Sequence, residues 1–407
     1  MRVMPVVVVT GARQTGKSTL VRALTEDMAV LGGASSAIPD RDRYLYLTLD
    51  SPAVIGRAVQ DPDAFVRQAE CLVIDEVQRQ PEILTAIKGA VDHDRPRRPG
   101  RFVLTGSANL LLMRRVNESL AGRASYLTLH PLTRREQLGL GTAGNWEAFL
   151  QTPVAKWRDL VLADVAPEED WRDLARRGGY PPAAYALERP ADRQLWFEGY
   201  VRTYLQRDVP EISAIENVPD FDRVLRAIAL RIGTLLNQTE LARDFGLAQS
   251  TVQRYVNVLE VSYQVVRLPA FAINRTTQLV RSPKYYWSDT GLAMALGRQT
   301  EPTGAHLENL VVQDLLVWRD SQQSPPELFH WRTHKGAEVD IVIQDGDALL
   351  PIEIKATSQP STKDLVSLRR FLAEHADRAI GGLLLHTGPD VFWIADRVLA
   401  APWWRVL

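Results

Sequence analysis

The hydrophobic and polar positions of the first third of the chain predict short strands separated by helices. Strand-like runs, either apolar throughout or alternating, occur at residues 5–10, 44–49, 72–74, 101–104 and 126–129. Helical patterns lie between most of them, for example at 17–30 and 81–91. Strands that alternate with helices are typical of a parallel sheet covered on both faces. We therefore expect residues 1–131 to form an α/β domain.

The pattern of the remaining residues divides them into three further regions. Residues 132–215 have a mainly helical pattern that is rich in arginine and tryptophan. Residues 216–300 hold a compact helical pattern with a turn at Gly246. Residues 301–407 become β-rich around one long helix. At roughly 100–200 residues per domain, this length predicts two to four domains, and these shifts mark their boundaries.

Composition excludes several classes of protein. The chain has 407 residues and a formal net charge of −1, so it is not a basic nucleic-acid coat, and any nucleic-acid surface would be a local patch. Its single cysteine, Cys71, excludes an intrachain disulfide and a cysteine-based zinc site. No apolar run is long enough to span a bilayer. We therefore expect a cytoplasmic protein with no membrane segment.

The first apolar strand is followed by a complete G-x-x-x-x-G-K-[ST] motif. It consists of Gly11, Ala12, Arg13, Gln14, Thr15, Gly16, Lys17 and Ser18. Backbone N–H groups of such a loop and the N-terminus of the next helix hold phosphates. Lys17 would reach the β- and γ-phosphates, and Ser18 would bind Mg²⁺. The alternative is a glycine-rich turn with a chance lysine, but the strand before it and the helix after it favour an ATP site.

A second strand-like run ends in two carboxylates, Asp75 and Glu76. Asp75 fits the role of an Mg²⁺ ligand acting through water. Glu76 fits a general base that orients or deprotonates the attacking water. The alternative is a strand that ends in solvent with acidic residues, which a phosphate loop upstream makes a weaker explanation.

Two further positions are candidates for contact with the γ-phosphate. Ser107 is the first choice after the fourth strand and Asn109 the second, with a plain strand-to-helix turn as the alternative. Arg123 would stabilise charge in the transition state, within its own chain or across an oligomer interface. The alternative for Arg123 is an ordinary surface arginine.

These motifs together resemble the prokaryotic AAA-type ATPases of the archaeal-ATPase and signal-transducing (STAND-like) branch that carry an uncharacterised C-terminal domain. The resemblance extends over nearly the whole chain and is carried by residues 11–19, 72–78, 104–109, 119–123, 178–181 and 196–208. It implies that Thr19 belongs to the nucleotide loop and that residues 132–215 form a helical lid. The family's Gly-Gly-aromatic-Pro break then places Pro181 near the nucleotide. Only ten residues precede the loop here, fewer than is usual in the family, so part of the adenine pocket is expected to be missing or to come from elsewhere.

Residues 239–255 have the pattern of a helix-turn-helix. Thr239 would cap a first helix that Gly246 ends, and Ser250 or Gln249 would begin the second. The exposed face of the second helix would present Gln249, Thr251, Gln253 and Arg254 to bases or phosphates of DNA or RNA. The alternative is a winged-helix packing unit that contacts protein, which the weakly basic charge balance favours.

Four charged residues of the last hundred are spaced so that they would converge. Glu353 and Lys355 share one face of a strand, Asp340 lies on the preceding strand, and Glu308 lies on the long helix. This arrangement resembles the PD-(D/E)XK, or restriction-endonuclease-like, superfamily. The resemblance implies that Asp340 and Glu353 bind a second Mg²⁺ or Mn²⁺, with Glu308 auxiliary and Lys355 stabilising the reacting phosphate. The alternative is a surface Glu–Lys pair.

We therefore expect an α/β protein with a P-loop NTPase sheet (1–131), a helical lid (132–215), a winged helix-turn-helix module (216–300) and a restriction-endonuclease-like α/β domain (301–407). The leading hypothesis is an Mg-ATP-dependent switch that acts on the C-terminal modules. One alternative is an ATP-gated, metal-dependent nuclease. Another is a protein-interaction switch whose nuclease fold is inactive. DNA or RNA and a second copy of the chain are the expected partners besides ATP.

Overall fold

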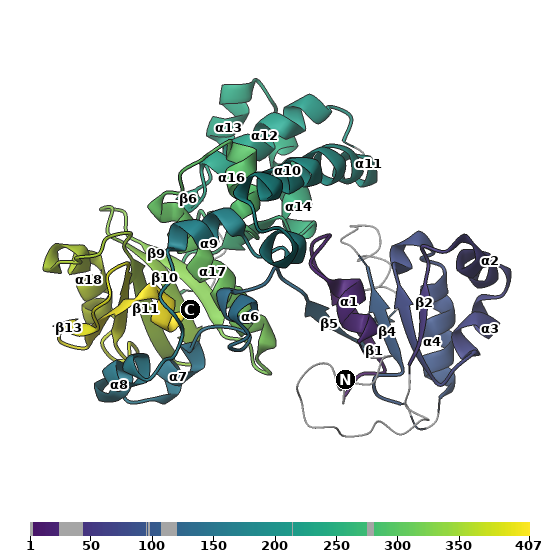
Figure 1. Ribbon diagram of the computed structural model, residues 1–407, viewed down its shortest axis with the longest axis horizontal. Coiled ribbons are helices and arrows are strands. Elements are labelled where there is room, and N and C mark those ends of the chain that lie inside the picture. Colours follow the sequence, from purple (N-terminus) through teal and green to yellow (C-terminus); the bar gives the residue numbers. More distant parts are fainter. Residues whose placement is uncertain are drawn as a thin grey trace. The chain divides into compact units, whose positions relative to one another are not determined.

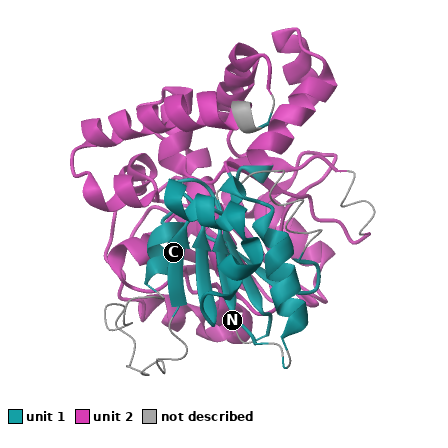
Figure 2. Cartoon of the chain, turned by 90° about the vertical axis from the view of Figure 1, so that its right-hand side faces the viewer, with its two compact units in different colours: residues 1–130, 211–214, 261–263 teal, residues 131–210, 215–260, 264–407 magenta. Residues whose placement is uncertain are grey.

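The computed structural model describes residues 3–23, 44–94, 96, 98–106, 120–213, 215–274 and 281–407. The chain forms two compact units (Figure 2). Unit 1 comprises Met1–His130 with the short segments Glu211–Ala214 and Val261–Tyr263. Unit 2 comprises Pro131–Pro210, Ile215–Glu260 and Gln264–Leu407. No helix among the described residues is both long enough and apolar enough to cross a membrane.

Unit 1 is built on a five-stranded parallel sheet in the order β2-β3-β4-β1-β5 (Figure 1). Its elements are β1 (Val6–Thr10), α1 (Lys17–Arg22), β2 (Tyr44–Thr48), α2 (Pro52–Gln60), α3 (Pro62–Arg67), β3 (Cys71–Asp75), η3 (Val77–Arg79), α4 (Ile83–His93), β4 (Phe102–Thr105) and β5 (Ala124–Thr128). Strands β1, β3 and β4 are buried along their whole length. Strands covered on both faces are apolar throughout, as the sequence predicted. The α/β fold class is confirmed.

The two faces of this sheet carry separate cores. Val6 and Val8 pack into one apolar cluster, whereas Val7 and Val9 pack into another. Successive side chains of a strand point to opposite faces, so an all-valine strand fills both cores. Because the strands are parallel, their carboxyl ends meet at one edge of the sheet, where Thr10 leads directly into the loop that begins at Gly11.

Unit 2 begins with helices. They are α6 (Arg134–Leu138), α7 (Trp146–Gln151), η4 (Val154–Lys156), α8 (Trp157–Leu162), α9 (Trp171–Arg177), η5 (Pro182–Ala186), α10 (Pro190–Tyr200), η6 (Val201–Asp208) and α11 (Val209–Ile212). The first of these helices pack on the C-terminal domain. Trp146 Nε1 donates a 2.5 Å hydrogen bond to Asp314 Oδ1, and Arg134 Nη1 donates to the carbonyl oxygen of Trp404 at 2.8 Å.

The helix-turn-helix lies between α12 (Val218–Leu230) and α16 (Thr290–Gly297). It consists of α13 (Gln238–Phe245) and α14 (Gln249–Val261), with an antiparallel sheet of β6 (Thr234–Leu235), β8 (Lys284–Trp287) and β7 (Val265–Leu268). Gly246, with φ of 67°, ends α13 as predicted. The prediction of Thr239 as the cap is wrong, because α13 begins one residue earlier and Asn237 accepts the 3.1 Å hydrogen bond from Glu240 N.

The C-terminal part of unit 2 is a six-stranded mixed sheet in the order β13-β14-β12-β11-β10-β9. Its elements are α17 (Gly304–Ser321), β9 (Glu327–Arg332), β10 (Glu338–Asp345), β11 (Ala348–Ile354), η7 (Thr362–Leu365), α18 (Val366–Glu374), β12 (Gly382–His386), β13 (Phe392–Ala395), β14 (Val398–Pro402) and α19 (Trp403–Val406). Strands β11, β12 and β14 run parallel, and the remaining pairs are antiparallel. The strands of Asp340 and Glu353, β10 and β11, are therefore neighbours, as the sequence predicted.

Candidate functional site

The phosphate-loop motif forms the turn between β1 and α1. Gly11 has φ of 138°, and a Cβ atom at this position would lie 2.2 Å from the carbonyl oxygen of Leu129. Gly16 precedes α1 in the left-handed conformation, with φ of 93°. Both positions therefore require glycine, for space at the first and for backbone conformation at the second. Arg13 and Gln14 are exposed at the tip of the loop.

Lys17 is held inside this loop. Its Nζ atom donates to the carbonyl oxygens of Ala12 at 2.6 Å and Gly11 at 3.1 Å, and Thr15 Oγ1 also donates to Ala12 O at 2.9 Å. Burial lowers the pKa of Lys17 to about 8, against the opposing effect of Glu76 and Asp75. The loop therefore presents a buried ammonium group at the position where the motif places phosphate.

Asp75, the last residue of β3, is the centre of a hydrogen-bond network. Its Oδ1 accepts from Ser18 Oγ at 3.2 Å and from Thr105 Oγ1, and its Oδ2 accepts from the Tyr46 hydroxyl at 2.5 Å. The carboxylate is buried. Ser18 and Asp75, the two predicted metal ligands, thus lie side by side, and their oxygens are the donor type that Mg²⁺ prefers.

Glu76 follows Asp75 in the left-handed conformation, with φ of 59°. A non-glycine residue in this region stores backbone strain, which the surroundings must hold in place. Its N–H donates to Thr105 Oγ1 at 3.3 Å, and its carboxylate accepts from Gln78 Nε2. Burial raises the pKa of Glu76, and the neighbouring Asp75 charge raises it further. Glu76 is therefore a carboxylate that takes up a proton more readily than an ordinary glutamate. Beside it, the carboxylate of Asp75 accepts hydrogen bonds from three hydroxyl groups.

Thr105 and Tyr46 were not predicted from the sequence. Thr105 ends β4, two residues before Ser107, and Ser107 and Asn109 lie outside the described residues. The available signal was the position of Thr105 as the first polar residue after an apolar strand. Tyr46 gave a weaker signal, as a polar-tipped side chain within an alternating strand.

Arg123 lies at the other edge of the sheet. Its carbonyl oxygen accepts a 3.1 Å hydrogen bond from the N–H of Val6, the first residue of β1, whereas the phosphate loop follows the last. At about 3.3 Å per residue, a five-residue strand separates the two edges by roughly 15 Å. The guanidinium group instead binds both carboxylate oxygens of Asp92, at 2.7 and 2.9 Å. The structure therefore contradicts a role at the nucleotide within its own chain, and a role across an interface stays a prediction.

The Gly178–Pro181 break lies in unit 2, where it has a structural explanation. Gly179 N donates to Asp289 Oδ2 at 2.6 Å, and a Cβ on Gly178 would lie 2.5 Å from Asp289 Oδ1. A Cβ on Gly179 would lie 2.2 Å from the carbonyl oxygen of Leu132. The two glycines therefore permit close packing on a buried carboxylate, and contact between Pro181 and a nucleotide stays a prediction.

The carboxylates predicted as a nuclease site surround a lysine that sequence reasoning missed. Lys284, on β8, is almost completely buried. Its Nζ lies 2.5 Å from Glu338 Oε1, 2.9 Å from Glu308 Oε1 and 3.7 Å from Asp340 Oδ1. Burial opposes the charge of this lysine, but the three carboxylates outweigh it and raise its pKa. The ammonium group thus lies between Glu308 and Asp340, which were expected to face a metal, and Glu338, which was not among the predicted residues.

Glu353, in β11, and Lys355, directly after the end of β11, form the predicted pair. Lys355 Nζ lies 2.6 Å from Glu353 Oε1, while Asp340 Oδ2 accepts from Ile354 N at 2.9 Å. Burial, and then the charge of Asp340, raises the pKa of Glu353. Among the residues that the structure describes, no three His, Cys, Asp or Glu side chains are arranged to hold a metal ion. The predicted metal group of Glu308, Asp340 and Glu353 is therefore not assembled, because lysines satisfy its members.

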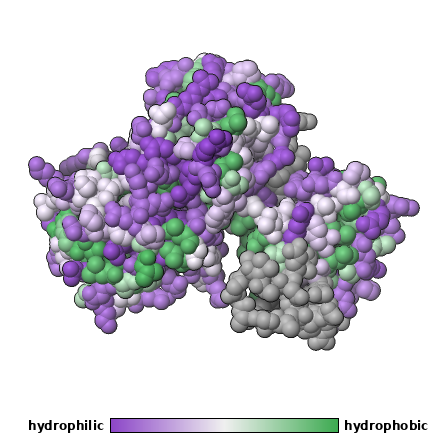
Figure 3. Space-filling model, in the orientation of Figure 1, coloured by the Kyte–Doolittle hydropathy of each residue, from purple (hydrophilic) through white to green (hydrophobic). Residues whose placement is uncertain are grey.

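The predicted nucleic-acid face of α14 is exposed. Gln249, Gln253 and Arg254 are exposed and Thr251 is half-buried, whereas the opposite face packs inward through Val252 and Tyr255. In the view of Figure 3, the surface over α12 and α13 is mainly hydrophilic. The residues are thus available for contact, and their binding to DNA or RNA stays a prediction.

Three family models match consecutive parts of the chain. Residues 4–138 match the AAA domain, residues 168–303 match a domain of unknown function (DUF8612), and residues 303–406 match another domain of unknown function (DUF4143). The AAA match covers the phosphate loop, Asp75, Glu76 and Thr105. The other two models carry no assigned activity.

The chain is also similar to curated proteins and to solved structures, but these similarities do not give it a function. The uncharacterized proteins Mb2031c of Mycobacterium bovis and Rv2008c of Mycobacterium tuberculosis are each 29% identical, over 98% of this chain and 80% of their own length. The Aeropyrum pernix ORC1 protein in complex with DNA is 13% identical and covers 72% of this chain and 86% of its own, with a TM-score of 0.27. Protein VC1899 from Vibrio cholerae is 12% identical, with coverages of 95% and 89% and a TM-score of 0.17. Residues 4–138 thus combine a phosphate-loop motif and a parallel sheet with a match to the AAA domain model, and these three findings support an AAA-type P-loop ATPase domain.

Proposed function

We propose that this protein binds Mg-ATP in unit 1, hydrolyses it, and uses the nucleotide state as a switch on the modules of unit 2. The observation that supports hydrolysis is the convergence of Lys17, Ser18, Asp75, Glu76 and Thr105 at the carboxyl edge of one parallel sheet. Ligands of open α/β sheets bind at this edge.

Each of these residues has a distinct role in the proposal. Lys17 leaves the carbonyl oxygens of Gly11 and Ala12 to pair with phosphate oxygens, and the loop N–H groups hold the rest of the negative charge. Ser18 and Asp75 hold Mg²⁺, which when bound neutralises charge on the transferred phosphoryl group. Glu76 accepts the proton of the attacking water, a role that its raised pKa favours.

The switch part of the proposal rests on how the chain is divided. Unit 1 includes Glu211–Ala214 and Val261–Tyr263, although the residues on both sides of each segment belong to unit 2. The second segment includes the last residue of α14, the helix with the exposed polar face. A change in unit 1 on nucleotide binding would therefore act on the helix-turn-helix through the chain itself.

We propose that the C-terminal domain binds a partner without cutting nucleic acid. Lys284 lies beside Glu308 and Asp340, two of the carboxylates that a metal would need, and offsets their charge. The competing candidate, an ATP-gated nuclease, is favoured by one observation, the placement of Asp340 and Glu353 on neighbouring strands with Lys355 directly after the second. Because lysine and metal cannot occupy the same position, the two candidates predict opposite results.

The test is to measure ATP turnover and nucleic-acid cleavage on the same preparations. Wild type, Lys17→Ala, Glu76→Gln and Asp340→Ala are incubated with Mg²⁺ or Mn²⁺ and single- or double-stranded DNA or RNA, with and without ATP. The proposal expects ATP turnover that Lys17→Ala and Glu76→Gln abolish and Asp340→Ala leaves intact, with no cleavage. Cleavage that Asp340→Ala removes would instead establish the nuclease, and absence of ATP turnover in wild type would refute the ATPase.

A further inference from the structure

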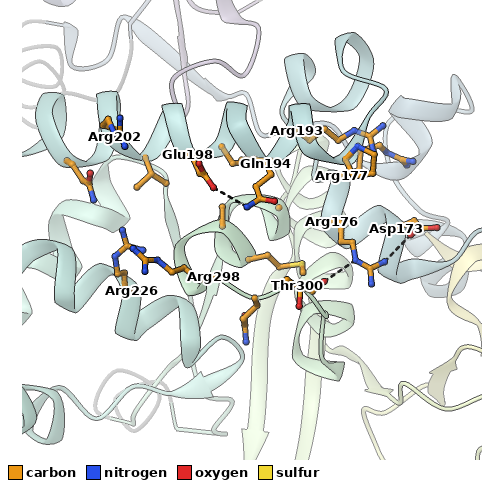
Figure 4. Close-up of a pocket in the computed structure, with 18 residues that line it drawn as sticks. Asp173, Arg176, Arg177, Arg193, Gln194, Glu198, Arg202, Arg226, Arg298 and Thr300 are labelled. Carbon is orange, nitrogen blue, oxygen red and sulfur yellow. Dashed lines mark hydrogen bonds and ion pairs between the residues drawn. The ribbon is translucent and has the colours of Figure 1, made fainter.

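Unit 2 contains a polar cavity that is separate from the nucleotide loop and from the Lys284 cluster. It has a volume of about 820 Å³ and is lined by α9, α10, η6, α12 and the end of α16 (Figure 4). Six arginines line it: Arg176, Arg177, Arg193, Arg202, Arg226 and Arg298. Only two acidic residues, Asp173 and Glu198, accompany them in the lining. The walls therefore carry a strong excess of positive charge.

Three of these arginines are held by carboxylates around the cavity. The ion pairs are Arg176 with Glu301 at 2.7 Å, Arg177 with Glu169 at 2.8 Å and Arg226 with Asp222 at 2.8 Å. Such pairs fix the direction of the guanidinium groups and the shape of the wall. They also offset the charge of these three arginines, so the attraction for an anion must come from the others.

The other three arginines have no ion pair among the residues that the structure describes. Arg193 donates Nε to the carbonyl oxygens of Leu187 at 2.8 Å and Ala183 at 3.2 Å, which orients it without neutralising it. Arg202 and Arg298 are exposed at the cavity. Of the two lining carboxylates, Asp173 pairs with Arg176. Glu198 accepts a 3.0 Å hydrogen bond from Gln194 and has no arginine partner among the described residues. Three arginines without an ion pair thus line the cavity, with Arg193 at the opposite end of the view in Figure 4 from Arg202 and Arg298.

Apolar side chains also line the cavity, among them Phe197 and Met294. Phe197 and Met294 are almost completely buried, and Gly291 lies against the Phe197 ring, where a Cβ would come within 2.5 Å of Cζ. Small-molecule sites typically have volumes of about 300–1,000 Å³ and combine apolar side chains with a few polar groups. The cavity meets this description, and its polar groups are arginines, which bind phosphate oxygens in a bidentate manner.

We propose that this cavity binds a small ligand with at least two phosphate groups and an apolar or flat body. The phosphates would contact Arg202 and Arg298, which lie at the same end of the view in Figure 4, and the body would lie against Phe197 and Met294. A concave site of this size encloses a small molecule, whereas the backbone of a nucleic acid is bound by an open groove that follows several phosphates. The site is distinct from the ATP site because all of its lining residues belong to unit 2.

The test uses inorganic tripolyphosphate as the probe and the full-length Lys17→Ala chain as the protein, so that the phosphate loop is disabled. Binding is measured by titration calorimetry at low and high salt. Arg202→Gln and Arg298→Asn are then added separately. Asparagine suits position 298, where φ is 50°, since it tolerates the left-handed conformation. Arg370→Gln, an exposed arginine on α18, is the matched control.

We expect each cavity variant to weaken tripolyphosphate binding by about tenfold, with the control unchanged and binding weaker at high salt. Unchanged thermal unfolding of Arg202→Gln and Arg298→Asn shows that the loss is local. The proposal is overturned if tripolyphosphate does not bind below about 1 mM, or if the cavity variants bind it as the control does. It is also overturned if a single-stranded oligonucleotide binds through the same arginines and displaces the probe, because the cavity would then contact nucleic acid.

Discussion

The Nζ atom of Lys284 lies 2.9 Å from Oε1 of Glu308, inside a group of acidic side chains on β10 and α17. The same ammonium group lies 2.5 Å from Glu338 Oε1. A lysine buried to this degree is tolerated only because the carboxylates satisfy it, and they are tolerated only because it is there. This mutual dependence leads to the first prediction.

Lys284→Met should destabilise the protein by about 3 kcal/mol, because it removes the buried counter-charge of the half-buried carboxylates of Glu308 and Asp340. Thermal unfolding should therefore begin at a clearly lower temperature. Lys363→Met, which removes an exposed lysine of the same domain, should change stability by less than about 0.5 kcal/mol. Adding Glu308→Gln to Lys284→Met should recover part of the loss. Equal unfolding temperatures for Lys284→Met and Lys363→Met would contradict this account of the cluster.

Thr105→Val should lower the ATP turnover number by about tenfold or more, with little change in KM for ATP. Valine keeps the shape of threonine but removes the hydroxyl that bonds Asp75 and receives the N–H of Glu76. Asp75 and Glu76 would then no longer be held in a fixed position relative to each other, whereas the phosphate loop would stay intact. Steady-state kinetics beside Thr85→Val, an exposed threonine on α4, is the measurement. A rise in KM alone would show that Thr105 acts in binding.

The sequence predicted the nucleotide loop and its strand well because both depend on neighbours in the chain. An apolar run, two glycines and a lysine suffice to predict β1, the loop and the start of α1. The contact of Thr105 with Asp75 depends instead on β3 and β4 being adjacent in the sheet. Strand order is a property of the whole fold, so no local pattern could indicate which polar residue after β4 reaches the site.

Lys284 shows the same limit more strongly. The spacing correctly predicted that Asp340 and Glu353 lie on neighbouring strands, and Lys355 follows the second strand directly. It could not predict that a lysine from β8, more than fifty residues before Asp340 in the chain, would pack between the carboxylates. A sequence motif can predict which of its own residues lie close together. The net charge of the site also depends on residues from distant segments, such as Lys284, which the motif does not include.

Arg123→Gln should leave ATP turnover of dilute protein unchanged and lower stability by at most about 1 kcal/mol. The pair with Asp92 is partly exposed, and Arg123 lies at the edge of the sheet opposite the phosphate loop. Turnover is measured over a range of protein concentrations, with Arg101→Gln, which removes another partly buried ion pair of unit 1, as the control. A loss in Arg123→Gln that appears only at high concentration would indicate action across an interface between copies.

Asp314→Asn should remove a pH dependence of stability between about pH 4 and pH 6. Burial raises the pKa of Asp314 from its ordinary 3.8 to about 6, against the hydrogen bonds from Trp146 and Gly144. In this range the folded chain binds a proton that the unfolded chain has released, so the stabilisation is full below pH 4 and is lost as the pH rises through 6.

At about 1.4 kcal/mol per pH unit, the whole contribution of Asp314 is on the order of 3 kcal/mol. Asparagine can keep both accepted hydrogen bonds on its oxygen and carries no charge. The variant should therefore match wild type at pH 4 and be more stable at pH 7, as measured by thermal unfolding in buffers of equal ionic strength. Asp345→Asn, at an exposed position with no such burial, should follow the wild-type curve. If Asp314→Asn lost stability at every pH by the same amount, Asp314 would contribute through packing and not through its proton.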